Sequence, residues 1–148
     1  MNFSKLKDRI VFLKPDYHFE NSVGETVPAW VPFSPYKPSL SDNPPVLTLT
    51  EGENEVRFYP GKTEADLEKF KVWASVVPTS GREYEEMQKI RAELTYKIRL
   101  RYVDQIENDF KILFRDKVFS IESIIDLNGA GREVELIAFE KVSEEYNG

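Results

Sequence analysis

Alternation of apolar and polar residues is the clearest pattern in the chain, and it is strongest between residues 94 and 102. The two sets of positions fall on opposite faces of a strand: Leu94, Tyr96, Ile98, Leu100 and Tyr102 against Thr95, Lys97, Arg99 and Arg101. A period of two predicts a β-strand with one face in a core and the other in solvent.

Shorter apolar runs, each bounded by turn-forming residues, predict further strands. These runs span 8–14, 46–50, 55–59, 72–78, 110–114, 117–125 and 133–139, and a short one ends at Trp30–Val31. The first run is apolar on both faces and should stop at Pro15, which cannot donate to a ladder. The runs on either side of Glu51–Asn54 predict a hairpin.

Two segments predict helices. Ser80–Glu83 has the form of a capping box, which predicts a helix at about 81–91. Thr63 is a suitable cap for a shorter helix over Glu64–Phe70. About six strands and one α-helix predict a mainly β fold, a small antiparallel β-barrel or sandwich.

The length of 148 residues predicts a single domain, 1–148. Seven of the nine prolines lie between residues 28 and 60, and residues 15–70 hold ten acids and four bases. We therefore expect a long proline-rich, acidic insertion at about 32–70, extended and exposed between Pro32 and Pro45. No apolar run approaches the roughly 20 residues that a bilayer requires, and the charged N-terminus lacks the pattern of a secretory signal.

The composition argues against catalysis. The chain has no cysteine and one histidine, His18, which excludes thiol nucleophiles and Cys/His zinc sites. Tyr59–Thr63 ends like a phosphate-binding loop, but Val56 stands where that loop needs glycine. We predict no enzyme, with no catalytic, metal-binding or cofactor-binding residues. A net charge of −6 also argues against binding phosphate backbone as the main role.

Two sets of residues are candidates for protein interfaces. The bases Lys97, Arg99 and Arg101 form a stripe that is a solvated outer face, a docking surface for an acidic partner, or a wall facing DNA. The insertion carries aromatic and aliphatic residues that are further interface candidates: Tyr36, Leu40, Leu47, Leu49, Phe58 and Tyr59. They predict either an arm that packs on a neighbouring subunit or a loop that narrows a channel.

The order of motifs resembles the phage head–tail joining family, the head-closure (stopper, or head–tail adaptor) proteins. The stretch Val72–Tyr84 contains Trp-Ala, a proline and Ser-Gly-Arg-Glu, and Tyr96–Tyr102 is a strand of alternating bases that ends in Arg-Tyr. The resemblance covers about residues 1–31 and 71–142. The insertion departs from the family pattern.

This resemblance implies a structural virion protein. Such subunits form a ring, usually of twelve copies, under the portal and adaptor, retain packaged DNA and offer the tail its attachment surface. The implied partners are further copies, portal or adaptor proteins, tail terminator or tail tube proteins, and packaged DNA near the channel, with no membrane and no cofactor. The implied location is the head–tail junction of a virion made in the host cytoplasm. The alternative is an OB-like barrel that binds nucleic acid.

Overall fold

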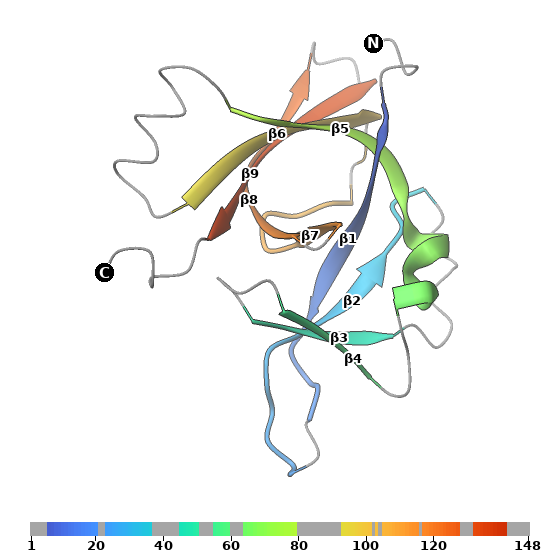
Figure 1. The fold of residues 1–148 in the computed structure, drawn as a ribbon, viewed down its shortest axis with the longest axis vertical. Coiled ribbons are helices and arrows are strands. Elements are labelled where there is room, and N and C mark those ends of the chain that lie inside the picture. The colour runs from blue at the N-terminus through green and yellow to red at the C-terminus, as the bar shows by residue number, and fades with distance from the viewer. Residues whose placement is uncertain are drawn as a thin grey trace.

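Nine strands and one short 3₁₀ helix make up the part of the chain that the computed structural model describes (Figure 1). The described residues are 6–20, 23–36, 45–50, 55–59, 64–79, 93–101, 103, 105–115, 117–127 and 132–141. The elements are β1 (Asp8–Asp16), β2 (Ala29–Phe33), β3 (Val46–Thr50), β4 (Glu55–Tyr59), η3 (Glu64–Phe70), β5 (Val72–Pro78), β6 (Glu93–Arg101), β7 (Lys111–Phe114), β8 (Lys117–Leu127) and β9 (Glu133–Lys141). The helix predicted at 81–91 lies outside the described residues.

Six strands close into an antiparallel barrel. The sheet runs β1-β5-β6-β9-β8-β7, and β7 pairs back onto β1 to complete the circle. Closure leaves the barrel strands with partners on both sides, which removes edges that would otherwise recruit other strands. The predicted mainly β fold with a small antiparallel barrel is therefore confirmed.

Both faces of β1 are apolar because both are buried. Ile10 and Phe12 point into the barrel, where they join the main core. Val11 and Leu13 point outward into a second apolar cluster on the outside of the barrel. The strand is thus shared by two cores, which explains a run that lacks the alternation of β6.

The second cluster is covered by parts of the expected insertion. β3 pairs with β2 and β4, as the predicted hairpin requires, and Leu47 of β3 is fully buried. Leu67 and Phe70 of η3 are also buried there, with Trp30 packed against the cluster. The helix predicted over 64–70 is present, as a 3₁₀ helix. These segments form an outer layer on the chain's own barrel.

Two expectations about prolines are wrong. β1 continues through Pro15 to Asp16, because this end of the strand pairs with β2 beyond the residues that pair with β7. A missing N–H is tolerated where the other side of a strand needs no partner. Pro32 is buried in β2 opposite Leu13, so the segment from Pro32 is not exposed at its start.

The alternation in β6 is confirmed for the residues described. Tyr96, Ile98 and Leu100 are buried in the barrel, and the three bases between and after them are exposed. Tyr96 stacks on Phe119 with the ring centroids 4.6 Å apart. Thr95 is the exception to the predicted polar face. It is buried, and its carbonyl accepts a hydrogen bond from the Thr79 N–H at 2.9 Å.

Candidate interaction surfaces

The basic stripe on β6 is exposed, but its charge is partly balanced within the sheet. Arg99 stands opposite Glu135 of β9, and its Nε donates to the carboxylate at 2.9 Å. Arg101 stands opposite Glu133, whereas Lys97 stands opposite Ile137. The sequence shows three bases without an acid because the balancing carboxylates come from another strand. Lys97 is therefore the base of the stripe that has no acid opposite it on β9.

Two predicted interface residues meet where the insertion begins. Tyr36 is 41% exposed, and its hydroxyl donates to the backbone carbonyl of Arg101 at 2.9 Å. Partial burial raises the pKa of Tyr36 to about 12, although the positive charge of Arg101 acts in the opposite direction. This contact joins the start of the insertion to the end of the basic stripe.

The other predicted insertion residues fall into different environments. Leu47 is buried in the second cluster of its own chain, so its side chain is not available to a neighbour. Leu49 lies in β3, and Phe58 and Tyr59 lie in β4, where the structure describes the backbone alone. Leu40 lies outside the described residues.

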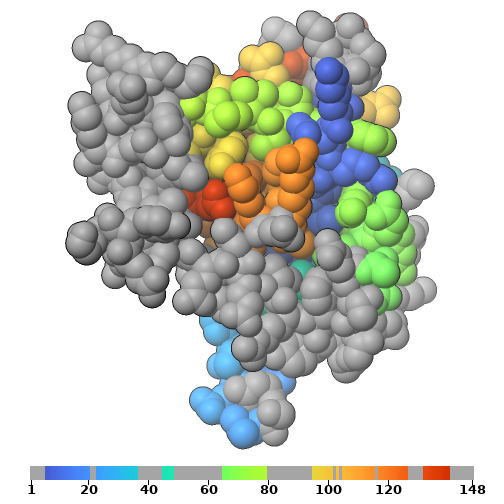
Figure 2. All heavy atoms as spheres, viewed as in Figure 1, coloured from blue at the N-terminus to red at the C-terminus, as the bar shows by residue number. Residues whose placement is uncertain are grey.

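A basic pocket that the sequence analysis missed lies between β1, η3 and β7. It has a volume of about 210 Å³, and four bases line it: Lys7, Arg9, Lys71 and Arg115. Apolar side chains also line it, namely Val11, Leu67, Leu113 and Phe114, together with Asp8. Figure 2 shows β1, β7 and η3 at the surface on one face of the molecule. We call this site the basic pocket.

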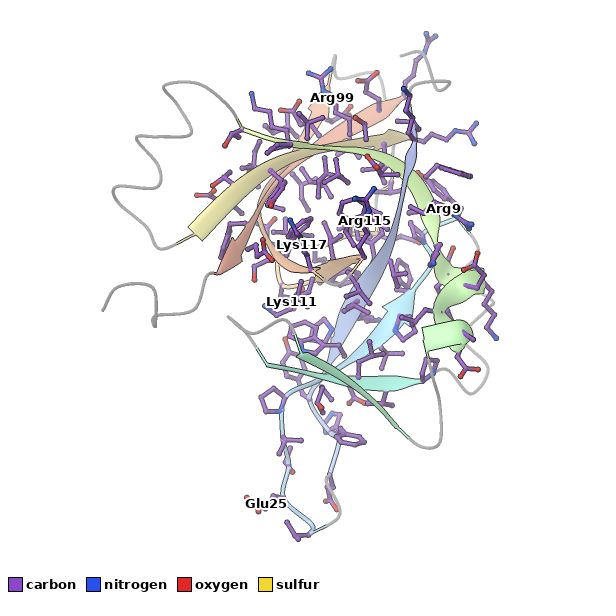
Figure 3. The ribbon with its side chains drawn as sticks, in the orientation of Figure 1. Arg9, Glu25, Arg99, Lys111, Arg115 and Lys117 are labelled. Carbon is purple, nitrogen blue, oxygen red and sulfur yellow. The ribbon has the colours of Figure 1, made fainter. Side chains whose placement is uncertain are left out.

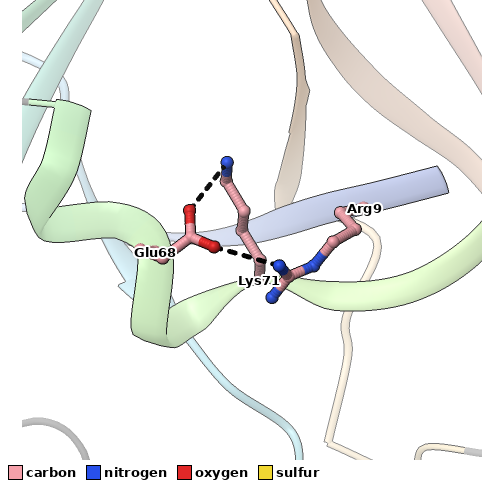
Figure 4. Close-up of polar contacts among 3 residues, drawn as sticks. All are labelled: Arg9, Glu68 and Lys71. Carbon is pink, nitrogen blue, oxygen red and sulfur yellow. Dashed lines mark hydrogen bonds and ion pairs between the residues drawn. The ribbon is translucent and has the colours of Figure 1, made fainter.

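Several contacts hold the bases of this pocket in place. Glu68 accepts from Arg9 at 3.0 Å and from Lys71 at 3.1 Å, as Figure 4 shows. The hydrogen bond from Lys71, the charge of Lys71 and the charge of Arg9 lower the pKa of the exposed Glu68 carboxyl. Arg9 also lies over the ring of Trp73, 5.1 Å from its centroid. Trp73 itself is half exposed.

Arg115 reaches the basic pocket from an unusual backbone conformation. Its φ is +56°, in the left-handed region that residues other than glycine rarely adopt. The residue forms the turn between β7 and β8, and its guanidinium lies 4.9 Å from the Phe114 ring centroid. The turn and the ring contact together fix the direction of the charge. Local sequence gives no signal for the pocket beyond the excess of bases in residues 1–14.

An acidic hairpin, residues 15–28, extends from the other end of β1 (Figures 1 and 3). The ladder pairs Asp16 with Ala29 and then Glu20 with Thr26, so the first strand carries one extra residue. Asp16 Oδ1 accepts the His18 N–H at 2.9 Å within this bulge. A bulge of this kind re-aims the end of a hairpin.

The hairpin is tied to the body at its base and exposed at its end. The Tyr17 hydroxyl donates to Asp109 Oδ2 at 3.1 Å, and this bond to a carboxylate is the main reason that the pKa of Tyr17 is raised. Val23 is 73% exposed near the tip, and Gly24 beside it turns the chain with φ +82°. An apolar hollow of about 350 Å³, lined in part by Trp30, lies at the base.

Within the described ranges, no group of three or more His, Asp or Glu side chains is placed to hold a metal ion. No helix of the described residues is long and apolar enough to cross a membrane. What the arrangement offers is surface: a basic stripe and a basic pocket, whose members Arg101 and Lys71 line one further hollow with Trp73, and an acidic hairpin at the other end of β1.

Comparison with known proteins identifies one family and several similar chains. A family model described as phage head completion protein matches residues 1–142. The head completion protein gp16 of Bacillus phage SPP1 is 29% identical over 87 residues, covering 58% of this chain and 80% of that protein. Among solved structures, protein SF1141 of Shigella flexneri 2a matches with a TM-score of 0.53 and 18% identity, covering 95% and 96% of the two chains. A chain from the virion of a native gene transfer agent particle gives a TM-score of 0.47 and 12% identity, over 93% and 96%.

Proposed function

The chain belongs to the phage head completion protein family, and from this membership we propose that it is a ring-forming subunit of the head–tail connector. The family is one of structural phage proteins and not a class of enzymes. The observation that carries the proposal is a family match that spans nearly the whole chain, from residue 1 to 142. The proposed subunit sits at the head–tail junction, closes the filled head and offers a surface to the tail.

The proposed partners follow from this position. Twelve copies form the ring, with portal or adaptor proteins on the head side and tail terminator or tail tube proteins on the other. Packaged DNA lies near the channel. A closed barrel that carries basic surface and an acidic hairpin at different ends of β1 supports a role in assembly, because a ring subunit needs different patches for its different neighbours.

The nucleic-acid-binding alternative has less support. Proteins of that kind stack bases on exposed aromatic side chains along a strand. Tyr96, the aromatic residue within the basic stripe's strand, is instead buried against Phe119. On the described part of β6 the stripe therefore has no stacking platform, and the exposed rings near it, Tyr36 and Trp73, lie beside Arg101 at its end.

Electron microscopy of particles made with and without this chain tests the proposal. We expect a ring of barrels between head and tail, and loss of both DNA retention and tail joining when the gene is deleted. Particles that lack the chain but still hold DNA and join tails would contradict the proposed role. A purified chain that binds single-stranded DNA with strong salt dependence would support the alternative.

We further propose that the basic stripe docks on an acidic surface of the adaptor or of a neighbouring copy. Lys97→Glu is the clearest test, because reversing Arg99 or Arg101 would also place two carboxylates opposite each other within the sheet. Lys14→Glu, at an exposed site on β1, is the matched control. We expect loss of attachment to heads for Lys97→Glu alone. Normal attachment of that variant would contradict docking through the stripe.

The insertion, on this proposal, is an arm over the next subunit rather than a gate in the channel. The described apolar residues Leu47 and Leu67 are buried against the chain's own barrel, so the proposed contact with the next subunit uses other residues of the insertion, such as the exposed Tyr36. Replacing residues 37–44 by a short Gly-Ser linker leaves both leucines in place. Failure to assemble would support the arm, whereas intact rings that leak DNA would support the gate.

A further inference from the structure

We propose that the acidic hairpin of one copy of this chain docks into the basic pocket of the next copy. This inference rests on the proposed ring and names the contact that would build it. The hairpin is residues 15–28, and the basic pocket is the cavity between β1, η3 and β7. The contact joins two different patches, so it is head-to-tail, and head-to-tail contacts generate rings when the rotation closes.

Charge is the first reason for the pairing. The hairpin segment holds Asp16, Glu20 and Glu25 and no lysine or arginine. The pocket holds four bases against two acids, Asp8 and the neighbouring Glu68, which leaves two positive charges. The chain as a whole carries −6, so the pocket is a local exception in an acidic protein. Opposite patches of this kind steer and align partners.

The apolar part of each surface is the second reason. The basic pocket combines its bases with side chains such as Leu113 and Phe114, and the hairpin exposes Val23 between Glu20 and Glu25. A DNA phosphate would use the bases but gains nothing from an apolar wall. A peptide segment that carries both an aliphatic side chain and carboxylates matches the whole pocket, which favours a protein occupant.

Geometry excludes the chain's own hairpin as the occupant, which leaves the hairpin of another copy. The pocket lies beside the first half of β1, and the hairpin leaves from the last residues of that strand, which at nine residues is about 30 Å long. Figure 3 shows Glu25 at the far end of the hairpin, pointing away from Arg9 and Arg115. The hairpin of the same chain therefore does not reach its own pocket. Because the two patches do not overlap, one copy can use both at once.

The pocket is also prepared for a second carboxylate. Arg9 uses its Nη1 on Glu68, and a guanidinium has five N–H donors. Arg115 is directed by its left-handed turn and by the Phe114 ring. Arginines held in place lose less freedom on binding a carboxylate, so the pocket is preorganised for one.

Cysteine cross-linking tests the contact directly, because the natural chain has no cysteine. The double variant Val23→Cys/Lys7→Cys places one thiol near the hairpin tip and one on the exposed rim of the pocket. Mild oxidation should give a ladder of dimers, trimers and larger products, and an equal mixture of the two single variants should stop at dimers. Val23→Cys/Val77→Cys is the control, with its second thiol at an exposed position of β5, and it should give no ladder.

The oxidation is done on concentrated full-length protein and on assembled particles. A ladder in assembled particles supports the contact. Particles that contain the double variant without cross-links overturn the hairpin contact while the connector role stands. A chain absent from particles contradicts the connector role instead, and the result in solution then decides the contact alone.

A charge exchange gives an independent test that needs no disulfide. Glu20→Lys/Glu25→Lys in the hairpin and Lys7→Glu/Arg115→Glu in the pocket should each weaken self-association at least tenfold, as measured by sedimentation. Mixing the two variants should restore association, because the reversed hairpin then faces the reversed pocket. No recovery, or tight binding of duplex DNA or inorganic phosphate that the pocket variant abolishes, would overturn the proposal.

A matched charge change elsewhere controls for net charge. Glu122→Lys/Asp126→Lys alters two exposed positions on β8 by the same amount as the hairpin variant. We expect its self-association to stay within about twofold of the natural chain. An equal loss in this variant would show that total charge, and not the hairpin, governs association.

Discussion

Replacing Leu47 by alanine should destabilise the whole barrel, although Leu47 lies in the proline-rich segment and outside the six barrel strands. Its side chain is fully buried in the second cluster, between the outer face of β1 and the η3 helix. The same cluster contains Val11 and Leu13, which belong to a barrel strand. Loss of Leu47 therefore leaves a cavity against the barrel itself.

The expected loss follows from this burial. Leucine-to-alanine changes at fully buried sites cost about 2–5 kcal/mol, the sum of lost transfer free energy and the cavity that remains. We expect about 3 kcal/mol, since an outer layer relaxes into a cavity more easily than a barrel interior. For a chain of this size, this corresponds to a fall in Tm of roughly 6–12 °C.

Urea unfolding measures the effect. The chain has two tryptophans, so a Trp73→Phe background leaves Trp30, beside the second cluster, as the single tryptophan whose fluorescence is followed. Circular dichroism of the strands is followed in parallel. Val77→Ala, at a half-exposed site on β5, is the control and should cost less than about 1 kcal/mol. A Leu47→Ala loss no larger than this control, or a Trp30 transition well before that of the strands, would refute the reasoning.

Three further predictions concern polar contacts. Tyr17→Phe removes the hydroxyl that donates to Asp109, so amide exchange in the acidic hairpin should become faster while global unfolding is unchanged; unchanged exchange would contradict the tie. The pKa of Tyr36 in the folded protein is raised to about 12, so the stabilisation by its protonated hydroxyl is complete below pH 10 and is lost as the pH rises toward 12. Tyr36→Phe should therefore flatten this alkaline decline in thermal stability. The pKa of Glu68 is lowered chiefly by the hydrogen bond from Lys71, so this stabilisation is present above about pH 4.5 and is lost as the pH falls; an NMR titration should show the Glu68 pKa rising in Lys71→Met.

Much of the barrel follows from local sequence. The alternation in β6 is visible because its two faces meet different surroundings, a core and solvent. The turn at Arg115 and the hairpin of β3 and β4 are also short-range features, set by residues next to one another. The apolar run of β1 predicts a strand, but it does not show that the outward face is covered by β3 and η3.

The surfaces are less predictable because their members come from distant strands. The basic pocket gathers Lys7, Arg9, Lys71 and Arg115 once β1 lies between β5 and β7. In the same way, the carboxylate that pairs with Arg99 belongs to β9, so the sequence of β6 alone does not predict this ion pair. Charge patterns along one strand therefore locate a surface but do not give its net charge.

The pairing of β1 with β7 also shapes how the protein is made. Val11 pairs with Leu113, so β1 leaves the ribosome before its partner β7, which follows roughly a hundred residues later. At a translation rate of about 5–20 residues per second, that delay is on the order of 5–20 seconds. Throughout this delay, the inward-facing side chains Ile10 and Phe12 lack the part of the barrel core that the later strands supply, which favours binding of nascent β1 by a chaperone.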